Sequence, residues 1–123
     1  MRVFTRLALA GAVLTGASSA VSAQAKSPAE EAKDIIVTRC NVCHGEKGDG
    51  NGIGAVALNP KPRNWSDAKW QKETTDDKIL KTIVEGGAGV GLSPTMTPNP
   101  DLKGKDAVLK ELLKTIRGFG AKK

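Results

Sequence analysis

The chain has 123 residues, of which 39% are hydrophobic and 26% are charged, and its 19 Lys and Arg residues outnumber its 13 Asp and Glu residues. This length is enough for one domain, and this composition excludes wholesale disorder, collagen-like repeats and a protein that crosses a membrane several times. The positive charge is modest and no basic run with interleaved aromatic residues occurs, so a nucleic-acid-binding protein is not indicated.

Residues 1–23 have the pattern of a secretion signal. Arg2 and Arg6 precede an apolar run over residues 7–17, and Val21-Ser22-Ala23 supplies the small residues at which a signal peptidase cuts, with Ala23-Gln24-Ala25 as a second cleavage site. A membrane anchor is the alternative, but the run is too short and too rich in Gly, Thr and Ser to fill about 20 apolar positions. We predict a cleaved leader over residues 1–23, a single domain over residues 24–123, and export to the periplasm as a soluble protein without a membrane anchor.

The predicted domain offers little material for a core. Removing Arg2 and Arg6 from the 19 basic residues leaves 17 against 13 acidic residues, a net charge of +4. Its only aromatic residues are Trp65, Trp70 and Phe119. Chains of this size bury barely enough surface to offset their conformational entropy, and a disulfide within a Cys-x-x-Cys pair would staple nothing distant. The two cysteines are therefore expected to do other work.

The first helix is predicted over about residues 28–40. Ser27 can cap it, Pro28 suits its first position, and Glu30 completes a capping box. Helical spacing places four residues on one face: Ala32, Ile35, Ile36 and Cys40.

Two more helices follow from the same signals. Thr74-Thr75-Asp76-Asp77 predicts a capped helix over about residues 76–85, which Gly86-Gly87 ends. A further helix is predicted over about residues 105–117, ending at Gly118. Its apolar stripe consists of Val108, Leu109, Leu112, Leu113 and Ile116.

Long loops rich in glycine and proline separate these helices, over residues 45–62 and 86–100. No stretch alternates in the manner of a strand, so the predicted fold class is all-α. Loops of this length in a compact domain are usually functional, and a large apolar cofactor could supply the core that they wrap.

Cys40-Asn41-Val42-Cys43-His44 has the Cys-x-x-Cys-His spacing of covalent haem attachment. Two thiols within one turn can add to the two vinyl groups of one porphyrin, and the following imidazole is carried beneath the iron. A thioredoxin-like dithiol would follow a strand and begin a helix, whereas this pair ends one. A zinc site would need a fourth ligand from a chain that has no other Cys or His, and a plain disulfide would leave His44 unexplained.

Met96 is the candidate for the second axial ligand. His44 is the only histidine, and Met96 is the only methionine outside the leader. It lies between Pro94 and Pro98, which stiffen the loop and can present its thioether at a fixed height. Packing in the core or solvation in a loop is the alternative for this methionine. Because soft sulfur stabilises ferrous iron, a His/Met pair raises the reduction potential relative to two nitrogen ligands.

With these motifs in this order, the chain resembles the class I c-type cytochromes, the small bacterial carriers with a single haem. The resemblance implies the cytochrome c fold, with three to five short helices around one covalently bound haem c, the first and last helices crossing, and an exposed haem edge as the electron port. It implies that Cys40 and Cys43 hold the porphyrin and that His44 and Met96 ligate the iron. The matching segments are Arg39 to Gly45, Gly48-Asp49-Gly50-x-Gly52, Asn59 to Trp65, Glu85-Gly86-Gly87, the Ser-Pro-x-Met at 93–96, and Ile116-Arg117.

Some positions depart from the pattern of the resembled family. Ile53 stands where a proline carbonyl commonly fixes the proximal imidazole, so the Ile53 carbonyl is expected to take that role. The chain has no Tyr, and the Trp65 N–H and Arg63 are the candidates for binding the haem propionates, against the alternatives of a core Trp and a solvated Arg. The helix crossing is expected to be aliphatic, through Ile36, Leu112 and Ile116.

The leading hypothesis is a soluble periplasmic one-electron carrier that cycles between Fe(III) and Fe(II), a monomer and not an enzyme. Its partners would be a larger redox donor and acceptor, with acidic docking surfaces as a further expectation. A gas-binding sensor or small peroxidase is the alternative and needs a displaceable Met96, while a dithiol oxidoreductase would carry no haem. The lysines at 69, 72, 78 and 81 form either a docking patch or a solvated face.

Overall fold

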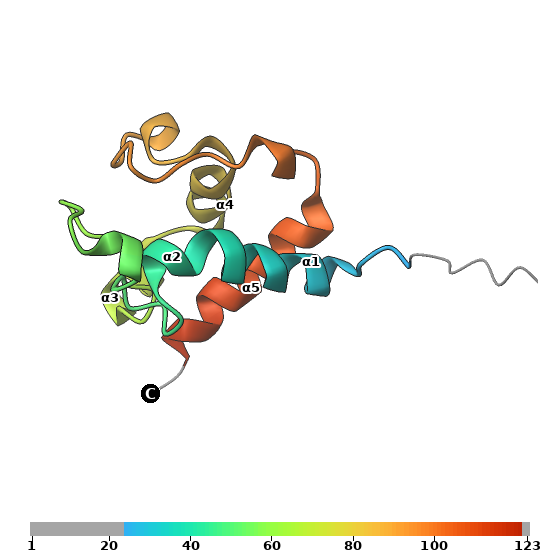
Figure 1. Ribbon diagram of the computed structural model, residues 1–123, viewed down its shortest axis with the longest axis horizontal. Coiled ribbons are helices and arrows are strands. Elements are labelled where there is room, and N and C mark those ends of the chain that lie inside the picture. The colour runs from blue at the N-terminus through green and yellow to red at the C-terminus, as the bar shows by residue number, and fades with distance from the viewer. Residues whose placement is uncertain (1–23, 122–123) are drawn as a thin grey trace, which may run out of the picture.

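The computed structural model describes residues 24–121, so the leader predicted over residues 1–23 lies outside the described residues. Within that range all regular structure is helical and no strand occurs, which confirms the all-α fold class (Figure 1). No helix within it has the length and apolar character needed to cross a membrane.

The first helix continues from Pro28 to His44 through α1 (Pro28–Ile35), the π-helical turn η1 (Ile36–Cys40) and α2 (Asn41–His44). The predicted capping box is present, because the Ser27 N–H donates to Glu30 Oε2 at 2.8 Å and the Glu30 N–H donates to Ser27 Oγ at 3.3 Å. The predicted end near residue 40 is wrong by one turn. The helix continues until Gly45, whose φ of 78° is the left-handed conformation that ends helices.

The two later helices agree with the sequence prediction except at the ends of α5. α4 (Asp76–Glu85) has the predicted bounds and the Thr75 cap, and α5 (Asp106–Gly120) starts one residue later than predicted. The expected stop at Gly118 is wrong, because α5 continues to Gly120. Phe119 packs 5.5 Å from the ring of Trp65, and this contact lies in the added turn.

Four short elements were not predicted. α3 (Ala68–Glu73) begins at Asp67, whose carboxylate accepts from two backbone N–H groups of the first turn. Three single 3₁₀ turns interrupt the segments that the sequence assigns to loops or leaves unassigned. They are η2 (Ile53–Ala55), η3 (Ala88–Val90) and η4 (Pro100–Leu102).

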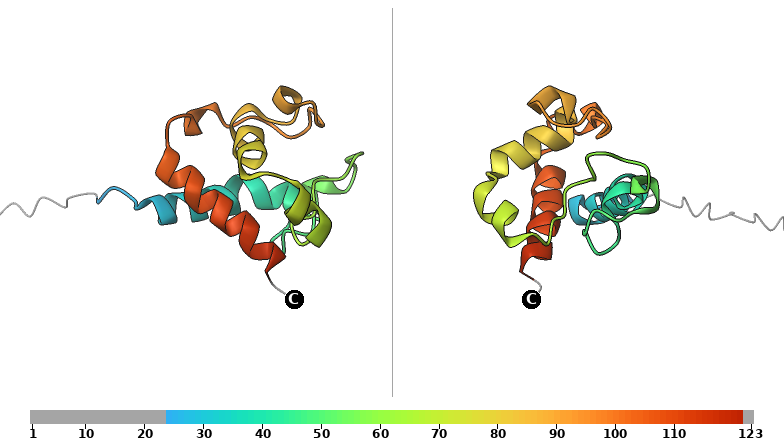
Figure 2. Two further views of the ribbon diagram at one scale, coloured as in Figure 1. Left: turned by 180° about the vertical axis from the view of Figure 1, so that it is seen from behind. Right: turned by 90° about the vertical axis from the view of Figure 1, so that its left-hand side faces the viewer.

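The core lies where α1 and α5 cross, a crossing visible from behind in Figure 2. Ile36, Leu112 and Ile116 belong to one buried cluster at this crossing, as the sequence predicted. The same cluster takes in Trp65 from the loop before α3 and Ile79 from α4. Residues from the helices and from the loops between them thus share one core.

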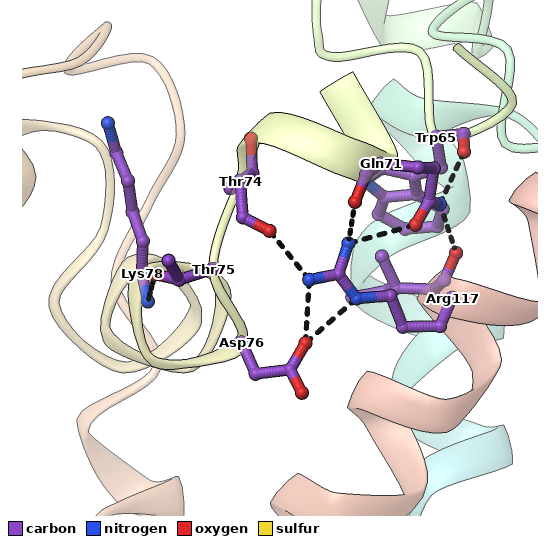
Figure 3. A network of polar contacts seen from close by, with 8 residues as sticks. Trp65, Gln71, Thr74, Thr75, Asp76, Lys78 and Arg117 are labelled. Carbon is purple, nitrogen blue, oxygen red and sulfur yellow. Dashed lines mark hydrogen bonds and ion pairs between the residues drawn. The ribbon is translucent and has the colours of Figure 1, made fainter. Parts of the chain in front are cut away.

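Arg117 joins α5 to the corner between α3 and α4 (Figure 3). Its Nη1 donates to the Gln71 carbonyl at 2.7 Å, and its Nη2 donates to the Thr74 carbonyl at 2.6 Å. Both Nε and Nη2 contact one carboxylate oxygen of Asp76 at the start of α4, at 2.8 and 2.6 Å. These contacts satisfy carbonyl groups at the end of α3 that have no partner in a further helical turn. Because the same guanidinium also binds the start of α4, the contacts fix the angle between α3 and α4.

Candidate functional site

The frame of helices and loops surrounds a cavity of about 330 Å³. Cys40, Cys43 and His44 line it from the end of the first helix, and Met96 lines it from the loop that follows α4. The structure therefore brings all four residues of the predicted haem site to one cavity, although 52 positions separate the last two in the sequence. Its apolar walls come from Ile35, Ile36, Ile79, Ile83, Leu112 and Ile116.

The π-helical turn just before the cysteines changes the register of the helix. The Asn41 N–H donates to the Ile36 carbonyl, five residues back, so one extra residue is accommodated in the turn. The same long helix can therefore bury Ile36 in the core and still line the cavity with Cys40 and Cys43.

The glycine-rich loop caps the end of α2 with its backbone. The Gly52 N–H donates to the Cys43 carbonyl at 3.0 Å, and the Gly50 N–H donates to the His44 carbonyl at 2.8 Å. A Cβ on Gly52 would overlap the Val42 carbonyl oxygen, so only glycine permits this close approach. The loop thus holds the attachment motif rigid through main-chain contacts.

His44 is held on two sides. Its Nδ1 lies 2.9 Å from the Arg63 carbonyl oxygen, and the Trp65 ring stacks on it at 4.2 Å with 16° between the planes. Since a carbonyl only accepts, Nδ1 carries the proton and Nε2 keeps the lone pair that a metal needs. Burial lowers the pKa of His44 and outweighs the opposing effect of the Arg63 carbonyl, so the ring is neutral at pH 7.

The carbonyl expected to fix this imidazole was assigned to Ile53, and that prediction is wrong. The carbonyl in contact with His44 belongs to Arg63, ten residues further on. The reason is the path of the segment around Pro62, which passes so close to Gly50 that a Cβ there would overlap the Pro62 carbonyl oxygen. Ile53 instead begins the turn η2 and is 86% exposed.

Arg63 and Trp65 both line the cavity. Arg63 is exposed, whereas Trp65 is buried. Their binding of haem propionates remains a prediction. The sequence missed the contacts that they make with His44, because a separation of about 20 positions carries no local signal.

Met96 is half-buried, and its backbone is tied at both sides. Its carbonyl accepts from the Gly87 N–H at 2.9 Å, and its N–H donates to the Ser93 carbonyl at 3.2 Å. A Cβ on Gly87 would overlap the Ser93 carbonyl oxygen, which explains the glycine at the end of α4. The backbone of Met96 is thus held where its side chain lines the cavity.

The cysteines are unbonded thiols, both half-buried. Burial raises the pKa of the Cys40 thiol to about 11, against the opposing effect of Arg39. A redox-active dithiol needs a lowered thiol pKa, so the site does not suit that alternative. No group of three or more His, Cys, Asp and Glu side chains that could hold a metal gathers anywhere in residues 24–121, as the zinc alternative would need.

All charged residues that line the cavity are basic: Arg39, Lys61, Arg63 and Lys78. With its apolar walls, this rim suits a large, flat, apolar group that carries acidic substituents. The two thiols suit vinyl addition, and a neutral imidazole and a thioether suit low-spin iron. The donor set therefore fits haem.

Comparison with known proteins agrees with this chemistry. A family model described as Cytochrome c matches residues 29–113, which covers the attachment motif and the Met96 loop. No curated protein and no solved structure shows significant similarity to the chain.

Proposed function

The chain belongs to the cytochrome c family and carries a covalently bound haem c, and on this premise we propose that it is an exported, soluble one-electron carrier with His44 and Met96 as axial ligands. The observation that carries the proposal is the convergence of these two side chains on one cavity, from a helix end and from a distant loop. The haem, when bound, supplies the Fe(III)/Fe(II) couple.

The chain's own residues hold the iron in place and tune it. The Arg63 carbonyl and the Trp65 ring fix the plane of the His44 imidazole, and Gly87 fixes the backbone of Met96. A thioether favours the ferrous state, so the pair raises the reduction potential. The apolar walls keep water away, which limits rearrangement when the charge changes.

The surface supports docking to acidic partners. Lys69 and Lys72 on α3 and Lys78 and Lys81 on α4 are all exposed, and Lys78 also lines the cavity. We propose that this face meets the redox donor and acceptor, in an association that weakens with added salt.

A small peroxidase or gas sensor is the second candidate. It is favoured by one observation: Met96 is only half-buried and lies on a loop, which would ease its displacement.

The visible spectrum of protein exported with the haem-attachment machinery separates the two candidates. We expect sharp low-spin bands in the oxidised and reduced forms that carbon monoxide does not change. Met96→Ala should then open the iron to carbon monoxide. High-spin bands or ready carbon monoxide binding by the wild-type protein would move it to the second candidate, and no haem bands at all would exclude both.

A further inference from the structure

An ion pair crosses the cavity rim between the attachment helix and the segment after Met96. Arg39 Nη1 lies 2.9 and 3.0 Å from the two carboxylate oxygens of Asp101, and 3.2 Å from Asn99 Oδ1. Arg39 is the last residue before Cys40, and Asn99 lies three positions after Met96. Both Arg39 and Asn99 line the same cavity as the two proposed iron ligands.

Asn99 is the centre of this cluster. Its side-chain Nδ2 donates to the Ile83 carbonyl at 2.9 Å, and its backbone N–H lies 3.2 and 3.1 Å from the carbonyls of Ile83 and Val84. These carbonyls belong to the last turn of α4, where helical partners run out. One amide side chain thus connects the attachment helix, the end of α4 and the Met96 loop.

The connection from Asn99 to Met96 is stiff. Pro98 and Pro100 flank Asn99 and fix φ on both sides of it. The other end of the loop is already held by the Gly87 N–H on the Met96 carbonyl. A displacement of Asn99 is therefore transmitted along the loop to Met96.

We propose that Arg39, Asn99 and Asp101 form a latch that holds the Met96 loop closed over the haem, so that Arg39 and Asp101 are positioning residues for the sixth ligand. This inference rests on the proposed function. The Arg39 and Asp101 side chains are 44% and 50% exposed, so the latch is weak and sensitive to salt. The latch shifts the equilibrium between the closed and open positions of the Met96 loop, and the fold does not depend on it.

Binding of an exogenous ligand measures that equilibrium. Imidazole on the ferric protein and carbon monoxide on the ferrous protein bind only where Met96 has left, so their apparent affinity scales with the open fraction. An exposed pair contributes up to about 1 kcal/mol, so Arg39→Gln and Asp101→Asn should each raise the apparent affinity up to about fivefold. The two changes should not add in the double variant, because they remove the same contact.

Lys105→Gln is the matched control. Lys105 pairs with Glu31 at 2.6 Å, across 74 positions and at similar exposure. This pair joins α1 to the start of α5, and neither residue lines the cavity that Met96 lines. Lys105→Gln removes one positive charge, as Arg39→Gln does, and should leave the apparent affinity for imidazole and carbon monoxide unchanged. Added salt should raise the ligand affinity of the wild-type protein and of Lys105→Gln, but not that of Arg39→Gln.

Hydrogen exchange gives a second readout that does not depend on ligand binding. The Gly87 amide, which donates to Met96, should exchange faster in Arg39→Gln and Asp101→Asn than in Lys105→Gln. Asp101 is 61 positions after Cys40 in the sequence, so Asp101→Asn leaves the residues of the attachment motif unchanged and tests the latch even if Arg39→Gln lowers haem loading.

The outcomes separate the latch from the proposed function. Ready binding of carbon monoxide by the wild-type protein would overturn both. A closed wild-type site with both latch variants equal to Lys105→Gln in ligand affinity and Gly87 exchange would overturn the latch alone. Increased affinity and faster exchange in the latch variants only would support it.

Discussion

Replacing Arg117 by methionine tests whether the corner between α3 and α4 depends on one guanidinium group. The change keeps most of the aliphatic stem and removes every charged donor. It leaves the carbonyls of Gln71 and Thr74 without the donors that now lie 2.7 and 2.6 Å away, and it leaves Asp76 unpaired.

The magnitude follows from exposure. The Arg117 side chain is 27% exposed and that of Asp76 is 59% exposed, so the ion pair itself contributes little, whereas the carbonyl contacts are the better buried part. Hydrogen bonds to a charged group contribute about 1.5–3 kcal/mol each, and water will replace part of this at a half-buried site. We expect a loss of about 2–4 kcal/mol in the free energy of unfolding, or about 10 °C or more in Tm for a domain of this size.

The assay is urea unfolding of the haem-bearing protein, since guanidinium chloride would screen the charges. Lys114→Met is the control, because Lys114 lies on the same helix with its side chain 77% exposed, and its loss should cost less than about 0.5 kcal/mol. Arg117→Lys should fall between, since an ammonium cannot reach all three partners. Equal stability of Arg117→Met and Lys114→Met would refute this account of the corner.

Three further predictions concern single positions. Gly87→Ala would place a Cβ on the Ser93 carbonyl oxygen, so it should lower the free energy of unfolding by more than about 1 kcal/mol and ease the binding of exogenous ligands. Gly118→Ala has open space around its Cβ and should raise the free energy of unfolding by about 0.5–1 kcal/mol, and urea unfolding measures both changes. Hydrogen bonds from Ser27 at the helix cap lower the pKa of Glu30, so the unfolded chain binds more protons than the folded chain at pH values between the two pKa values. The free energy of unfolding should therefore fall as the pH drops below about 4.5, and Glu30→Gln should make this fall less steep. Trp65→Leu should alter the electron paramagnetic resonance signal and the reduction potential of the ferric protein by freeing the His44 ring, whereas Trp65→Phe should keep both closer to the wild type.

The parts of the fold that the sequence predicted are those with local signals. The capping hydroxyl of Ser27 and the apolar stripe of α5 lie within a few positions of the structure that they specify. The helix α3 was missed because none of its residues is buried, so it has no apolar stripe. Its stability comes from the Asp67 cap and from Arg117, which lies about 45 positions away.

The candidate site divides in the same way. Cys40, Cys43 and His44 carry their chemistry in their spacing, and Met96 stands out because the only other methionine is Met1. Which carbonyl meets the imidazole depends on how the segment around Pro62 and Arg63 passes the turn at Gly50, and no local pattern specifies that. Ile53 was predicted from its place after the glycine turn, whereas the carbonyl that meets His44 comes from the segment that passes close to Gly50.

The cavity also predicts how the chain behaves without its haem. Without haem, the apolar walls of this cavity of about 330 Å³ would face water and lose their packing partner, in a domain whose whole stability is only about 5–15 kcal/mol. The double variant Cys40→Ser and Cys43→Ser, which cannot attach haem covalently, should therefore lose helical circular dichroism and cooperative unfolding. Met96→Ala keeps the attachment and should remain folded, which separates loss of the haem from loss of a ligand. Retention of the wild-type far-ultraviolet spectrum by the double cysteine variant would mean that the helices and loops fold without the haem, and would refute this dependence.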